Sequence, residues 1–141
     1  MQILIVYTSQ SGNTKKVVDL VKEQLLSRGH NVTVKNALTV TPEKVDEAEL
    51  LVIGTPVHGF ILFGQKPAKP VREFLNSQLP DDLSNKPVIG FATYLFFPSK
   101  ALKPIEDAIK SRNGKLLDLI TNKRSNKSIL VSDILECISS L

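Results

Sequence analysis

Five short apolar segments alternate with segments of helical periodicity along the whole chain. The apolar segments cover about residues 2–7, 32–35, 50–54, 87–93 and 115–120. The third, Leu50-Leu51-Val52-Ile53-Gly54, is a continuous apolar run, which is typical of a strand covered on both faces. Strands that alternate with helices predict a parallel sheet with helices on both sides. We therefore expect a three-layer α/β/α fold with a five-stranded parallel sheet.

Composition places the chain among ordinary globular proteins. It has 141 residues, of which 42% are hydrophobic and 23% charged, without repeats or a linker, so we expect one domain over residues 1–141. No apolar run approaches the ~18 residues of a membrane span. The chain enters a core strand at once, without a signal peptide, which predicts a cytoplasmic protein. The single Cys137 excludes an internal disulfide, and its helical spacing with Leu130 and Ile134 predicts a buried thiol.

The net charge of +4 does not by itself indicate a nucleic-acid partner, because the lysines are scattered along the chain. The densest basic cluster contains no interleaved aromatic residue and consists of Lys115, Lys123, Arg124 and Lys127. A solvated loop is the favoured interpretation of this cluster, and contact with an acidic partner is the alternative.

The first strand is followed directly by a loop of hydroxyls, amides and glycine, Thr8-Ser9-Gln10-Ser11-Gly12-Asn13-Thr14, which leads into a helix. The first turn of a helix has N–H groups without partners and carries partial positive charge, so it favours an anion. Ser9, Gln10, Ser11, Asn13 and Thr14 offer further donors, and Gly12 can bring the backbone close to a ligand. The loop therefore predicts a phosphate site.

A plain helix cap is the competing interpretation of this loop, with Ser11 or Asn13 as the N-cap. The loop matches neither G-x-x-x-x-G-K-[ST] nor G-x-G-x-x-G, so it does not indicate triphosphate hydrolysis or dinucleotide binding.

Two further segments are expected beside this loop, because ligands of parallel sheets bind at the carboxyl ends of the strands. After the third strand, Thr55 to about Lys66 is predicted to be a long, largely apolar loop that includes His58. The imidazole of His58 can lie against a ring system, or it can be a surface side chain without a role. A metal site is not expected there, since the only other histidine, His30, falls at the opposite end of the first helix. After the fourth strand, Tyr94 is the aromatic residue best placed to stack on a planar ring.

These three segments resemble the flavodoxin family, and the resemblance covers almost the whole chain. It rests on T-S-Q-S-G-N-T, on G-T-P-V-H-G and on T-Y at the end of the fourth strand. The resemblance implies a sheet of strand order 2-1-3-4-5 and noncovalent binding of FMN. It also implies that Ser9, Gln10, Ser11, Gly12, Asn13 and Thr14 hold the phosphate, while Pro56, Val57, His58, Gly59, Thr93, Tyr94 and Leu95 flank the flavin ring.

The chain departs from the acidic electron carriers of that family. It has no tryptophan, and between Pro56 and Pro80 the only acidic residue is Glu73, beside Lys66, Lys69 and Arg72. Without carboxylates near the ring, we expect the reduced anionic flavin to be less disfavoured than in an acidic carrier.

The resemblance favours an electron-transfer protein whose partner is a redox protein or a small-molecule electron acceptor. No triad or carboxylate pair in the predicted loops argues for an enzyme. Two alternatives stay open: a flavin-dependent quinone or nitro-compound reductase, and a binding module with weak or no affinity for FMN.

Overall fold

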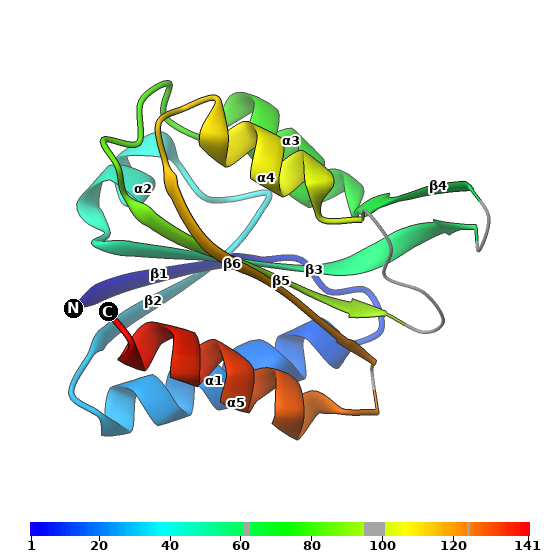
Figure 1. The fold of residues 1–141 in the computed structure, drawn as a ribbon, viewed down its shortest axis with the longest axis horizontal. Coiled ribbons are helices and arrows are strands. Elements are labelled where there is room, and N and C mark those ends of the chain that lie inside the picture. The colour runs from blue at the N-terminus through cyan, green and yellow to red at the C-terminus, as the bar shows by residue number, and fades with distance from the viewer. Residues whose placement is uncertain (61–62, 95–100, 124) are drawn as a thin grey trace.

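A central sheet separates two layers of helices (Figure 1). The computed structural model describes residues 1–60, 63–94, 101–123 and 125–141. In chain order the elements are β1 (Gln2–Tyr7), α1 (Asn13–Ser27), β2 (Asn31–Asn36), α2 (Pro42–Glu47), β3 (Leu50–Phe60), β4 (Phe63–Pro67), α3 (Lys69–Ser77), β5 (Pro87–Tyr94), α4 (Lys103–Lys110), β6 (Lys115–Lys123) and α5 (Lys127–Ser139).

Five of the strands are parallel, in the order β2-β1-β3-β5-β6. This confirms the expected order 2-1-3-4-5 when the parallel strands are counted along the chain. The order reverses between β1 and β3, because the chain leaves β1 toward β2 and then returns to the other side of β1. The carboxyl ends of β1 and β3 therefore lie at the switch point of the sheet, where such folds bind ligands.

Two separate cores lie on the two faces of the sheet. One face packs against α2, α3 and α4, and the other packs against α1 and α5 (Figure 1). The pattern of α1 explains its orientation, because its buried side chains recur at helical spacing: Thr14, Val17, Val18, Val21 and Leu25. The apolar run of β3 is covered from both sides, and Leu50, Leu51, Val52 and Ile53 are all fully buried.

The segment after the third parallel strand is not the irregular loop that the sequence predicted. β3 continues to Phe60, and β4 pairs with it antiparallel, with Val57 opposite Pro67 and His58 opposite Lys66. The pairing is irregular between His58 and Phe60. This hairpin extends beyond the carboxyl edge of the parallel sheet (Figure 1). Strand pairing thus gives this segment backbone partners that an irregular loop would lack.

The cysteine prediction is confirmed only in part. The free thiol of Cys137 is half-buried and packs against the core between the sheet, α1 and α5. Among the described helices, none combines the length and hydropathy that crossing a bilayer requires.

Candidate functional site

The loop between β1 and α1 presents a row of backbone N–H groups. Gly12 is the N-cap residue of α1, with φ 86°, and it has no side chain that could cap the helix. Neither Ser11 nor Asn13 therefore acts as the cap that the competing interpretation required. Among the hydrogen bonds of the described residues, none has a backbone N–H between Ser9 and Thr14 as its donor. Thr14 is only 1% exposed, so its N–H lacks both a protein acceptor and free access to water.

The two serine hydroxyls of this loop can donate hydrogen bonds to a ligand. The Oγ of Ser9 accepts a bond from the N–H of Lys15 at 3.3 Å, and the Oγ of Ser11 accepts one from Asn13 Nδ2 at 2.8 Å. Because both oxygens act as acceptors, each O–H remains free to donate to a ligand. Nothing lies within 4 Å of where a Cβ on Gly12 would be, so the cradle is open at this point. The donor set suits a phosphate.

A buried hydroxyl pair joins this loop to the end of β5. Thr14 Oγ1 lies 3.1 Å from Thr93 Oγ1, and Thr93 is fully buried. Thr93 in turn pairs in register with Pro56 of β3. The structure therefore brings together one residue from each of the three segments that the sequence singled out.

The other predicted residues are described to different extents. Pro56 is buried and Val57 half-buried, while His58 and Gly59 are placed by the backbone of β3 alone. Tyr94 is half-buried at the end of β5, opposite Lys123 of β6. Leu95 lies outside the described residues.

Thr55 positions the hairpin, a role that the sequence did not reveal. Its side chain is fully buried, donates to the carbonyl of Pro56 at 2.8 Å and accepts from the N–H of Ala68 at 2.9 Å. Arg72 Nε donates to the carbonyl of Pro67 at 3.1 Å. These bonds join both strands of the hairpin to α3. One sequence feature could have indicated this role. Thr55 places a hydroxyl directly after an apolar strand, where a buried hydroxyl needs a hydrogen-bond partner.

Close packing under the switch point depends on Gly54. A Cβ at this position would lie 2.3 Å from Cζ of Phe91, which is a fully buried ring on β5. The backbone of β3 can therefore lie against the Phe91 ring only where no side chain is present. Thr8 N–H donates to the carbonyl of Gly54 at 3.2 Å, which continues the β1–β3 contact into the polar loop.

The charged groups nearest the loop are lysines. Lys15 and Lys16 stand in the first turn of α1, which holds no acidic residue. The ammonium of Lys15 binds Asp19 at 2.6 Å, and this hydrogen bond raises the pKa of Lys15 above its ordinary value. Lys16 has no ion pair among the described residues. The site thus carries positive charge without any carboxylate in the first helical turn.

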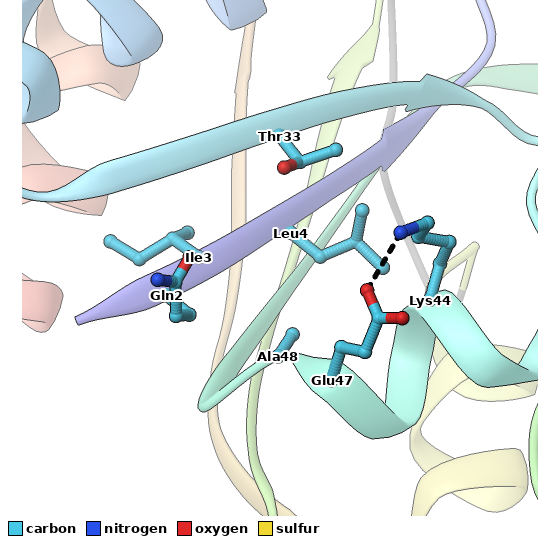
Figure 2. Close-up of a pocket in the computed structure, with 7 residues that line it drawn as sticks. All are labelled: Gln2, Ile3, Leu4, Thr33, Lys44, Glu47 and Ala48. Atoms are coloured by element: carbon cyan, nitrogen blue, oxygen red, sulfur yellow. Dashed lines mark hydrogen bonds and ion pairs between the residues drawn. The ribbon is translucent and has the colours of Figure 1, made fainter.

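A small cavity of about 40 Å³ lies between β1, β2 and α2, away from the carboxyl edge of the sheet (Figure 2). Its lining combines the start of β1 with Thr33 of β2 and with α2, where Lys44 binds Glu47 at 2.7 Å. Cofactor pockets have volumes of roughly 300–1,000 Å³, so this cavity has room only for water. Among the described residues, no group of three or more His, Cys, Asp or Glu side chains is placed to hold a metal ion.

Known proteins resemble this chain over most of its length. The model of the flavodoxin domain matches residues 4–125. The flavodoxin of Clostridium beijerinckii is 24% identical over 103 residues, which is 73% of this chain and 72% of that protein. The solution structure of two-electron reduced Megasphaera elsdenii flavodoxin has a TM-score of 0.83 at 17% identity, and 99% of each chain is covered. Oxidised flavodoxin 2 of Bacillus cereus has a TM-score of 0.82 at 20% identity, with the same coverage. Together with the strand order, these matches show that the chain belongs to the flavodoxin family.

Proposed function

We propose that the protein binds FMN noncovalently and transfers electrons to and from it. Membership of the flavodoxin family implies this chemistry. When bound, the flavin supplies the redox reaction, and the protein supplies binding, orientation and electrostatics. The observation that carries the proposal is the row of N–H groups from Ser9 to Thr14, which has no protein acceptor and lies at the switch point.

In this proposal the phosphate of FMN accepts bonds from the loop Ser9–Thr14. Helix α1 adds the partial positive charge of its first turn. The side chains of Ser9, Gln10, Ser11, Asn13 and Thr14 supplement the backbone donors, and Gly12 leaves room for the phosphate oxygens. The site therefore needs no fixed positive charge in direct contact with the phosphate.

The flavin ring is proposed to lie between two segments of the carboxyl edge. Pro56, Val57, His58 and Gly59 of β3 form one wall, and Thr93, Tyr94 and Leu95 form the other. The geometry that supports this arrangement is the register of Pro56 with Thr93 and the hydroxyl contact between Thr93 and Thr14. An apolar wall excludes water from the ring, which strengthens the electrostatic influence of nearby groups.

Fluorescence titration of the purified protein with FMN and with riboflavin tests the proposal. We expect FMN to be quenched on binding and riboflavin, which lacks the phosphate, to bind more weakly. Ser11→Ala should weaken FMN binding by about 1.5–3 kcal/mol, since it removes a hydrogen bond to a charged group, and should leave riboflavin binding nearly unchanged.

Ser27→Ala is the matched control, because it makes the same change at the far end of α1, where the hydroxyl donates to the carbonyl of Gln24. It should alter neither affinity. Unchanged FMN fluorescence would contradict FMN binding itself. Equal losses for the two ligands in Ser11→Ala would contradict the assignment of the phosphate loop.

A further inference from the structure

Lysines are concentrated at the starts of the four long helices, all of which begin at the carboxyl edge of the sheet (Figure 1). We call these lysines, together with Lys66 of the hairpin, the basic rim: Lys15, Lys16, Lys66, Lys69, Lys103 and Lys127. They come from segments far apart in the sequence. Only the fold gathers them around the edge that holds the candidate FMN site.

Helix stability does not explain this arrangement. The N-terminus of a helix carries partial positive charge, so a lysine in the first turn is unfavourable and an acidic residue is favoured. The first turns of α1, α3 and α5 nevertheless hold no acidic residue. Lysines at these helix ends reduce the stability of the fold. Their position therefore indicates a role other than stabilising the helices.

The carboxylates near the rim are already engaged by lysines. Each of three rim lysines binds an acid one turn further along its helix: Lys15 with Asp19 at 2.6 Å, Lys69 with Glu73 at 3.7 Å and Lys103 with Asp107 at 2.7 Å. The acidic residue in the first turn of α4, Glu106, is bound by Lys110 at 2.6 Å. These exposed pairs roughly cancel in charge.

Positive charge remains on the rim after this pairing. Lys16 and Lys66 are exposed, and neither has an ion pair with another described residue. The opposite edge is instead of mixed charge. Arg28, Lys44, Lys86 and Lys115 lie there together with five acidic residues: Asp46, Glu47, Glu49, Asp81 and Asp82. The field at the cofactor edge is therefore positive and unbalanced.

We propose that the basic rim is the docking surface for the acidic face of a redox partner protein. The inference rests on the proposed function, because it assumes that electrons leave and enter the bound flavin at the carboxyl edge. Complementary charge speeds the encounter and fixes its orientation, and here the protein provides the positive side. The lysines come from the hairpin and from helices on both faces of the sheet, so they flank the carboxyl edge from two sides. That arrangement fits the approach of a globular protein better than the approach of a nucleic-acid backbone, which favours a continuous basic stripe.

The test uses the full chain mixed with FMN and, as the acidic probe, a plant-type [2Fe–2S] ferredoxin. We expect association at about 20 mM salt that weakens about tenfold at about 200 mM, as exposed charges are screened. The double variant Lys16→Glu/Lys66→Glu should weaken association about tenfold at low salt. Its unfolding midpoint should be unchanged or raised, because glutamate suits the first turn of α1.

The matched control is Lys22→Glu/Lys115→Glu, which makes the same change in net charge at exposed lysines away from the rim. It should leave the affinity for ferredoxin within about twofold of the unmodified protein. Equal losses in the two double variants would overturn the proposal in favour of net charge alone. Lack of association at low salt would also overturn it, and so would tighter binding of a DNA duplex than of ferredoxin.

FMN fluorescence is recorded for every variant in the same samples. If FMN is not bound, the proposed function fails at that measurement, whatever ferredoxin does. If FMN is bound and the rim variant still associates with ferredoxin as the control does, only the docking surface fails.

Discussion

Single residues decide how closely the segments of this site approach one another. Gly12 and Gly54 show two different requirements. Gly12 needs freedom of the backbone, since its φ is 86° while the space beside it is open. Gly54 needs the absence of a side chain, since the Phe91 ring occupies the place of a Cβ. One glycine shapes the proposed phosphate cradle, and the other supports the strand beneath it.

The two glycines should therefore respond differently to alanine. Gly12→Ala should reduce the free energy of unfolding by about 1–2 kcal/mol, the cost of a left-handed residue with a Cβ. Gly54→Ala adds the displacement of a buried aromatic ring and should cost about 1–3 kcal/mol, with movement of Phe91. Urea denaturation gives both free energies. The near-ultraviolet and aromatic NMR signals should change in Gly54→Ala and not in Gly12→Ala, and the reverse pattern would contradict the packing argument.

At the level of elements, the hairpin and α3 behave as one unit. Thr55 binds both the start of the hairpin and the N–H of Ala68, and Ala68 is fully buried. These bonds fix the base of the hairpin that carries His58 against the start of α3 and the edge of the sheet. A loop without this bond would leave a buried N–H without a partner.

Thr55→Val should destabilise the protein by about 1–3 kcal/mol, because it has nearly the same volume but leaves the Ala68 N–H unsatisfied. Thr55→Ser keeps the hydroxyl and should recover much of that loss. Hydrogen exchange of the Ala68 amide should accelerate in Thr55→Val and stay slow in Thr55→Ser. An exchange rate that is equal in the two variants would show that this bond does not hold the hairpin.

Helix α5 and β6 together set the reactivity of the one thiol. Burial raises the pKa of Cys137 above its ordinary value of 9.0, and the charge of Asp118 on β6 raises the pKa further. The folded state therefore holds this proton more tightly than the unfolded chain. The resulting stability is present below the pKa of the unfolded thiol and is lost as the pH rises through that of the folded thiol.

We expect Cys137 to react slowly with a disulfide reagent at neutral pH. Because the thiolate is the nucleophile, the rate should keep rising with pH and should level off at a higher pH than the rate of a free thiol does. Asp118→Asn should speed the reaction at a fixed pH, and Glu23→Gln on α1 is the control for loss of a distant carboxylate. A titration of thiol absorbance against pH gives the pKa directly. A Cys137 pKa below that of a free thiol would be incompatible with the packing described.

At the level of the whole molecule, the fold brings lysines that are scattered in the sequence to one edge of the sheet, where they create a positive electrostatic potential. The chain has a net charge of +4, and its rim lysines lie around the edge where FMN is proposed to bind. Positive charge there should favour the negatively charged reduced flavin, while surface charges at this distance remain open to screening by salt.

The reduction potential of the bound flavin should therefore depend on salt with a definite sign. Raising the salt from about 20 mM to about 500 mM screens the lysines and should make the step that forms the anionic reduced flavin more negative. Lys16→Glu should shift the potential in the same direction at low salt and should reduce its salt dependence. Redox titrations at fixed pH measure both effects. A potential that becomes less negative with salt would mean that carboxylates dominate the field.

The sequence alone determined the layers of the fold, the order of the parallel strands through the family resemblance, and the region of the site. Those features follow from local patterns: buried apolar runs, helical periodicity and the polar loop Thr8–Thr14 after β1. The tertiary structure decided what depends on partners distant in the chain. It turned the predicted loop from Thr55 to about Lys66 into a hairpin, because the extended β3 pairs with β4. It paired Thr14 with Thr93 across 79 positions, and it gathered lysines from four helices and the hairpin at one edge. Contacts of this kind depend on the packing of the sheet, which no local pattern contains.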